Sequence, residues 1–311
     1  MISELLQVSV IIGILHSGIR LAAPYLYAAL GETVAQRSGV LDLGVDGIML
    51  MGAFMAFYVV FETGNLWLGV AAAIFVGILM GVLMSVISVT YQAEQGISGI
   101  GLYMFGLGLS SLLFRVLIGS VEGVSGFTEL PIPVLSDIPV IGEIFFNHSI
   151  LVYLAYIMVL VIWFLFDKTT LGLKVRAVGQ NPEAADSLGV GVNRVRYFGV
   201  IFGAAMAGVA GATLSIDLLN VFQDNITNGI GFIAVALVYF GGWRPLGVLL
   251  GSLLFATVSA LQLWGQALDI QILPSDLMVM LPYVLTIIVL IFSSGKVRQP
   301  AALNKPFERS G

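Results

Sequence analysis

The chain has 311 residues, of which 59% are hydrophobic and 10% are charged. About a quarter of the residues in soluble domains are charged, so this composition excludes a soluble domain and indicates a membrane protein. The net charge is −5, and the absence of cysteine excludes disulfides and thiolate chemistry. Apolar runs of about 20 residues predict spanning helices, because barrel strands are short and alternating. We predict an all-α polytopic integral membrane protein with one transmembrane domain over residues 1–311.

The N-terminal stretch, residues 1–16, is apolar but shorter than the roughly 20 residues that a span needs. We expect an interfacial elbow helix here, with a short first span as the alternative. The first full span is expected over Gly18–Ala35.

A polar break, RSGVLDLGVDG (Arg37–Gly47), follows this span and contains glycines and two aspartates. Irregular backbone at membrane depth is tolerated only where it faces protein or a water-filled cavity, and carboxylates there are usually functional. Two interpretations stay open: residues that line a pathway or gate, and ordinary positions in water at the membrane interface. Glu32 and Arg37 are five residues apart and within reach of pairing. The pathway interpretation names Glu32, Arg37, Asp42, Asp46 and Gly47.

Further spans bring the expected total to about nine. A GxxxG pair, Gly77 and Gly81, predicts close contact between two helices. The tail, residues 293–311, is hydrophilic and is predicted to be a disordered cytoplasmic segment. The remaining spans are expected over Ile48–Phe61, Leu66–Val89, Ile97–Gly119, Ile150–Phe166, Phe198–Ser215, Gly229–Phe240, Val248–Trp264 and Leu277–Phe292.

The loop over residues 167–196 is the polar segment that interrupts the second half of the chain. Asn181-Pro182 predicts the start of a short helix, because proline fits the first turn of a helix. The pattern EAAxxxG follows, with small alanine side chains for close packing and a glycine to end the helix. An amphipathic connector is the simpler alternative. We predict a cytoplasmic coupling element that contacts an ATPase through Gly179, Asn181, Pro182, Glu183, Ala184, Ala185 and Gly189.

The basic residues predict the orientation. The tail and the breaks on the same side as the coupling loop hold 11 of the 13 Lys and Arg residues. Cytoplasmic loops carry such an excess, so the coupling loop and the C-terminus are expected in the cytoplasm. The number of spans then places the N-terminus outside.

A weak internal repeat links the two halves of the chain. DGIMLMGA (Asp46–Ala53) followed by WLGVAAAI resembles NGIGFIAVA (Asn228–Ala236) followed by PLGVLLGS. In the predicted topology the two copies run in opposite directions, as in inverted-repeat transporters. Chance similarity between apolar segments is the alternative. The repeat adds Asn228 and Gly229 to the predicted pathway residues.

Other motifs point away from catalysis. His16 and His148 fall outside the expected spans and lack partners at metal-ligand spacing, so both are expected at the surface and no metal site is predicted. No GxxxxGK[ST] motif is present, so any ATP chemistry must come from a partner. No nucleophile–base set stands out either. We expect a transport subunit without its own cofactor, and not an enzyme.

Three blocks carry a family resemblance: ALGETVAQRSGVLDLGVDGIMLMGAF (Ala29–Phe54), GQNPEAADSLGV (Gly179–Val190) and NGIGFIAVALVYFGGWRPLG (Asn228–Gly247). The sequence resembles bacterial ABC-importer permeases of the ribose and branched-chain amino-acid type, and most closely the nucleoside branch. Family members commonly read GVLNLGVEG where this chain has Asp42 and Asp46. The resemblance implies a multi-pass protein of the bacterial inner membrane. It also implies an ABC ATPase, a second permease subunit (a homologue or a second copy) and an external substrate-binding lipoprotein.

The substrate implied by the resemblance is a nucleoside, with a simple sugar as the alternative. The rival function is a self-sufficient ion-coupled transporter or channel, with Glu32, Asp42 and Asp46 as a cation relay. The need for an ATPase partner distinguishes the two functions. An integral-membrane enzyme is a third possibility, without a clustered catalytic set to support it.

Overall fold

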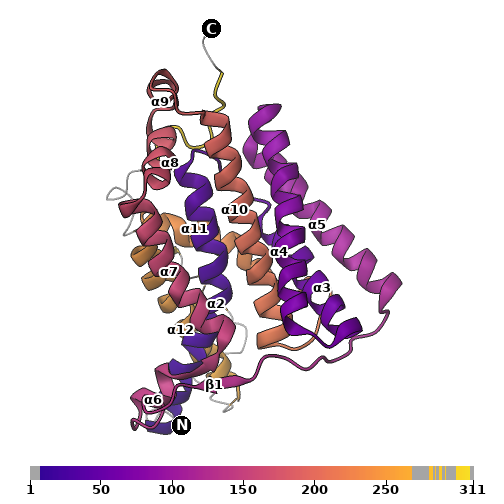
Figure 1. Ribbon diagram of the computed structural model, residues 1–311. Helices are drawn as coiled ribbons and strands as arrows, with labels where there is room; N and C mark the ends of the chain where they lie inside the picture. Colours follow the sequence, from indigo (N-terminus) through magenta and orange to yellow (C-terminus); the bar gives the residue numbers. More distant parts are fainter. Residues whose placement is uncertain are drawn as a thin grey trace.

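The computed structural model describes residues 8–267 and 299–308, together with positions 280–282, 284, 287, 288 and 291. Within this part of the chain the protein is a bundle of long apolar helices (Figure 1). Seven described helices are long and apolar enough to cross a membrane, and α11 is a shorter apolar helix. The expected span over Leu277–Phe292 lies largely outside the described residues, so the count of nine stays a prediction.

The first described helix, α2 (Val8–Arg37), runs through the centre of the bundle. At 1.5 Å per residue its 30 residues extend about 45 Å, more than the roughly 30 Å of a hydrocarbon core. The elbow boundary expected near residue 16 is therefore wrong for residues 8–16, which continue directly into the span. The reason is tertiary packing, because Gly13 contacts the indole of Trp264 and Ser17 accepts a hydrogen bond from that indole at 3.1 Å.

Three helices follow α2 on one side of the bundle: α3 (Val45–Thr63), α4 (Leu66–Ser85) and α5 (Gln95–Leu117). A π-helical turn, η1 (Val86–Thr90), extends α4. Gly77 and Gly81 of α4 pack directly against Ala204 of α10, which confirms the close helix contact predicted from their spacing. Small residues at such positions let two helix backbones approach each other.

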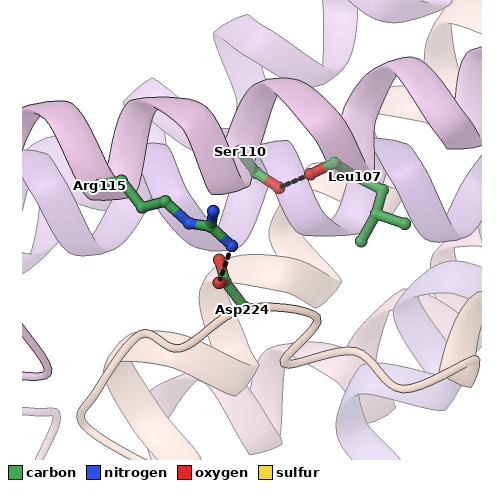
Figure 2. A network of polar contacts seen from close by, with 4 residues as sticks. All are labelled: Leu107, Ser110, Arg115 and Asp224. Carbon is green, nitrogen blue, oxygen red and sulfur yellow. Dashed lines mark hydrogen bonds and ion pairs between the residues drawn. The ribbon is translucent and has the colours of Figure 1, made fainter. Parts of the chain in front are cut away.

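The segment between α5 and α7 lies at the end of the bundle where α2 begins (Figure 1). It contains a short antiparallel pair of strands, β1 (Glu129–Pro131) and β2 (Asn147–Ser149), and the short helix α6 (Ile141–Phe145). Figure 2 shows Arg115 of α5 directed toward Asp224, and the two side chains form an ion pair at 3.1 Å. Their side chains are 73% and 43% exposed, so this pair contributes at most about 1 kcal/mol.

The second half of the chain contains α7 (Ile150–Lys168), α8 (Thr170–Gln180), α9 (Pro182–Ser187) and α10 (Val192–Thr213). The π-helical turn η2 (Leu214–Leu218) extends α10, and α11 (Ile230–Phe240) and α12 (Pro245–Ala267) complete the described bundle. α10 packs against α2, α3 and α4, and it is the most buried of the long helices. The core therefore lies where α2, α3, α4 and α10 meet.

Residues 299–308 lie on the bundle end that carries α8 and α9. Asn304 N–H donates to the Gly39 carbonyl at 3.2 Å, and Gln92 Nε2 donates to the Phe307 carbonyl at 2.8 Å. The expectation of a disordered tail is wrong for these residues. Arg196, expected on the polar loop, is 1% exposed and donates to the Lys305 carbonyl at 3.0 Å. The sequence did not predict this burial because the tail residues that cover Arg196 are more than 100 positions away.

The two histidines also differ from expectation. His148 is 1% exposed, and its ring stacks on that of His16 with centroids 4.5 Å apart. Each imidazole bonds a backbone carbonyl: His16 that of Asn147 and His148 that of Ile144, both at 2.9 Å. The surface prediction for His148 is wrong, because β2 and α6 fold over the start of α2. Burial lowers the pKa of His148 to about 4.

Candidate functional site

α9 is a short helix whose ends are determined by its own residues. The side-chain oxygen of Asn181 accepts a hydrogen bond from Ala184 N–H at 3.0 Å, which caps the first turn. Pro182 lies in that turn, where a backbone N–H would have no acceptor within the helix, so its missing N–H costs no hydrogen bond. Gly189 has φ +80°, a left-handed conformation that glycine adopts without strain. The helix predicted to begin at Asn181-Pro182 is present, and its role in coupling stays a prediction.

One side of α9 is exposed. Ala185 is 3% exposed and faces inward, whereas Glu183 and Ala184 are exposed and Leu188 is 85% exposed. A carboxylate beside small and apolar side chains forms a mixed surface of the kind that a partner protein can bury. The arrangement therefore suits a docking element.

Gly179 has a different position from the rest of the predicted coupling set. It is buried in α8, and a Cβ atom at this position would overlap the carbonyl oxygen of Arg37 at the end of α2. Its own carbonyl accepts a hydrogen bond from Ala302 N–H at 2.9 Å. Gly179 thus joins α8 to the end of α2 and to the tail, beneath the docking surface.

The two predicted breaks, near Asp46 and Asn228, meet inside the bundle. α11 begins after Gly229, which has no side chain to cap the helix. Asp46 of α3 supplies the missing cap: its carboxylate accepts from Gly231 N–H at 2.7 Å and from the Thr227 hydroxyl at 3.0 Å. A carboxylate at a helix N-terminus also interacts favourably with the helix dipole. Asp46 is fully buried, so these bonds are shielded from water.

From this contact α3 and α11 run in opposite directions. α3 ends at Thr63, at the bundle end that carries β1, and Gly64 and Phe127 line one cavity there. α11 ends at Phe240, and the following turn lies beside Arg37 at the opposite end. Two helices that start together inside the bundle and run to opposite ends are the arrangement expected of an inverted repeat. The geometry supports that prediction.

A second buried polar network lies at the end of α2. Glu32 accepts hydrogen bonds from the Gln36 amide at 2.9 Å and from Asp42 N–H at 3.1 Å. The side-chain oxygen Oε1 of Gln36 in turn accepts a hydrogen bond from the Trp243 indole N–H at 2.7 Å. The network therefore fixes residues 38–44, the connection from α2 to α3, against the turn between α11 and α12.

Asp42 and Arg37 complete the predicted set near this connection. Asp42 accepts a hydrogen bond from Gly44 N–H at 2.8 Å, and burial raises the pKa of its carboxyl to about 6. Arg37 does not pair with Glu32: its guanidinium lies over the Phe166 ring, 4.9 Å from the centroid. The expected Glu32–Arg37 pair is replaced because the two side chains leave α2 toward different neighbours.

A cavity of about 220 Å³ lies beside the N-terminal end of α11. Its described lining contains hydroxyls, amides and aromatic rings but no charged side chain, which suits an uncharged polar solute better than an ion. The rings of Tyr25 and Phe255 meet edge to face with centroids 5.2 Å apart. The polar and aromatic lining residues are Tyr25, Thr227, Asn228, Phe255, Ser259 and Gln262.

The predicted pathway residues divide between this cavity and the packed interior. Asn228 lines the cavity, and Asp46 accepts a hydrogen bond from Thr227, which also lines it. Gly229 follows with φ +85°, and no described atom lies within 4 Å of the position that a Cβ would take. Glu32, Arg37 and Asp42 are absent from the described lining. Gly47 packs against α5, because a Cβ there would lie 2.6 Å from the Cα of Tyr103.

Sequence reasoning missed most of the lining. Ser259 and Gln262 are three residues apart in the apolar helix α12, so they share one face, and this polar pair was a usable signal. Tyr25 follows Pro24, the proline inside α2, which also marks an unusual place in a span. Phe255 gave no signal, since an aromatic residue in an apolar helix is ordinary. No cluster of His, Asp and Glu suited to a metal lies within the described residues.

The bundle of long apolar helices defines a polytopic membrane protein, and the polar cavity between its helices is of the kind that a transport protein contains. Residues 14–290 match the family described as "Branched-chain amino acid transport system / permease component", and the chain belongs to this family. It is therefore an ABC-transporter permease component, as the three sequence blocks indicated. No solved structure matches the chain.

Three relatives are similar over nearly their whole length. The guanosine ABC transporter permease protein NupQ of Bacillus subtilis is 35% identical over 92% of this chain and 93% of its own. The nucleoside ABC transporter permease protein NupC of Lactococcus lactis is 34% identical over 90% and 92%. TsgC13 of Haloferax volcanii, a candidate glucose ABC transporter permease, is 36% identical over 96% and 98%.

Proposed function

We propose that this chain is the membrane-spanning subunit of an ABC importer that moves nucleosides into the cell. The similarity to the guanosine and nucleoside permeases, over nine-tenths of each chain, carries this proposal. The cavity beside α11 supports it, because aromatic rings and uncharged amides suit a base and a sugar. A monosaccharide would meet the same hydroxyls and amides with less use for the ring pair, and the TsgC13 similarity makes it the second candidate.

The energy for transport comes from a separate ATPase subunit that receives α9. The chain holds no GxxxxGK[ST] motif for binding ATP itself. The exposed surface of Glu183, Ala184 and Leu188 is the part of α9 available to a partner. ATP binding moves the docked ATPase, and α9 passes this motion to the helices, so that two states with different substrate access alternate.

The pathway is completed by a second permease subunit. Ligand sites are typically about 300 to 1,000 Å³, and the cavity in this chain measures about 220 Å³. A homologous permease or a second copy would enlarge it at their interface. An external lipoprotein delivers the substrate to the bundle end that carries β1 and α6, which is the outer end by the distribution of basic residues.

Reconstitution into liposomes tests the proposal. The permease with its partner permease, ATPase and binding protein should show guanosine uptake and guanosine-stimulated ATP hydrolysis. Glu183→Lys should lower the stimulation at least about tenfold, because it reverses the charge on the docking surface. Glu308→Lys is the matched control, since Glu308 is also an exposed carboxylate but lies in the tail, outside α9 and away from the end that receives the lipoprotein.

Two results would reject the proposal. Uptake by this chain alone, driven by an ion gradient without ATPase, would make it a self-sufficient transporter. Uptake of glucose with no competition by guanosine would keep the ABC function and replace the substrate.

A further inference from the structure

A second cavity, of about 670 Å³, lies at the bundle end that carries α8, between α7 and the start of α12. Three arginines from three different elements line it: Arg37 at the end of α2, Arg176 of α8 and Arg244 of the turn before α12. Asp167 is the one carboxylate among its described lining residues. The cavity therefore carries a local excess of two positive charges.

These guanidinium groups are poorly neutralised by the protein. Among the described residues the single ion pair here joins Arg176 Nη1 and Asp167 Oδ1 at 3.7 Å, longer than a good hydrogen bond. The Nε of Arg176 is buried and has no hydrogen-bond partner among the described residues. Arg37 is held over the Phe166 ring. Asp167 is a nearby opposite charge for Arg37, and Arg176 and Arg244 are like charges. Three converging arginines with spare donors suit a phosphate, whose oxygens accept paired guanidinium bonds.

The sides of the same cavity are apolar and open. Leu246 and Leu250 of α12 are 54% and 68% exposed, and Trp163 of α7 is 39% exposed. Leu254 lies one turn further along α12, so this apolar strip continues toward the middle of the helix. A basic floor at the end of the spans and an apolar strip along them match the two parts of a phospholipid.

We propose that this cavity binds an anionic phospholipid, with the headgroup phosphate on Arg37, Arg176 and Arg244 and an acyl chain along Leu246 and Leu250. A free phosphate would use the arginines but not the apolar strip. The ATPase is expected at α9, whereas this cavity opens between α7 and α12. The site does not depend on the transported substrate, and only its place in the inner leaflet rests on the orientation under the proposed function.

Lipid titration of the detergent-purified transporter complex, followed by native mass spectrometry, tests this site. Phosphatidylglycerol should bind in preference to phosphatidylcholine. Arg176→Gln and Arg244→Gln should each weaken phosphatidylglycerol binding about fivefold, as expected for the loss of one basic group near a lipid surface. Lys174→Gln is the matched control, since Lys174 is an exposed cation on the same helix outside the cavity.

Two further arms identify the ligand. Leu250→Asn should weaken phosphatidylglycerol binding but leave any binding of inorganic phosphate unchanged. Excess inorganic phosphate should fail to displace the lipid. Equal binding by Arg176→Gln, Arg244→Gln and Lys174→Gln, or full displacement by phosphate, would overturn the proposal. If Arg176→Gln lowers thermal stability, the exposed Arg244 decides the result alone, because its substitution disturbs no packed residue.

Discussion

The bond between Asp46 and the start of α11 joins the beginnings of two helices inside the bundle. Asp46→Ala removes the acceptor for Gly231 N–H at 2.7 Å and for the Thr227 hydroxyl at 3.0 Å. Gly231 is buried and is not among the described residues that line the cavity, so its N–H regains no partner from water. The first turn of α11 also loses its cap, which its own residue Gly229 cannot replace.

The size of the effect follows from these two bonds. Removing a helix cap costs about 0.5–2 kcal/mol, and a hydrogen bond to a charged group contributes about 1.5–3 kcal/mol. We expect Asp46→Ala to lower the free energy of unfolding by about 2–4 kcal/mol. Thr227→Val removes one of the two bonds and should cost about 1–2 kcal/mol. Asp46→Asn keeps the shape and one acceptor, so it should cost less than Asp46→Ala.

A double-mutant cycle provides the assay. The free energy of unfolding is measured by denaturant titration in detergent for Asp46→Ala, Thr227→Val and the double variant. Since the two residues touch, their effects should fall short of additivity by about 1 kcal/mol. Additive effects, or an Asp46→Ala protein as stable as the original, would refute the capping role. Asp46 would then be an ordinary residue in water at the membrane interface.

Four other predictions follow from the same structure. Gly47→Leu should lower thermal stability, because the Tyr103 backbone occupies the space that the new side chain needs. Gly229→Leu should fold with a backbone strain of about 1–2 kcal/mol and lose transport. An equal loss of thermal stability in both variants would remove Gly229 from the pathway. Burial lowers the pKa of His148 to about 4, so its contribution to the free energy of unfolding should be complete above pH 6.5 and fall as the pH drops toward 4. A His148→Gln protein whose free energy of unfolding has the same pH dependence would contradict this. Cysteine at position 125 should react with an impermeant thiol reagent from outside and cysteine at position 187 only from inside; labelling of position 187 from outside would reverse the orientation. Gly179→Ala should keep basal ATP hydrolysis and lose its stimulation by substrate, and unchanged stimulation would show that the contact beneath α9 is dispensable.

The helices of this bundle could be predicted largely from the sequence. Apolar runs give the spans, and Asn181-Pro182 and Gly189 give both ends of α9, because these signals act within a few residues. A close helix contact of α4 was also predicted from the spacing of Gly77 and Gly81, whereas its partner α10 became known only from the structure.

What the sequence did not reveal depends on contacts between distant residues. The continuity of α2 rests on Trp264, and the burial of Arg196 rests on the tail around Lys305. The cavity takes its lining from α2, the segment before α11, and α12, and no local pattern states that these three meet. Asp46 was recognised as important, but its partner Thr227 lies 181 residues away, so its role as a cap became visible only in the fold.

The predicted docking surface and the cavity are connected by a continuous series of close contacts. Gly179, which lies just before α9, rests on the Arg37 carbonyl at the end of α2. From there residues 38–44 lead to Asp46, and Asp46 bonds Thr227, which lines the cavity beside Asn228. Packed backbone of this kind changes between discrete arrangements and does not bend gradually, so a displacement of α9 must either shift the 38–44 connection or break the Gly179 contact. This is the physical reason to expect that one methyl group at Gly179, far from the substrate, uncouples ATP hydrolysis from transport.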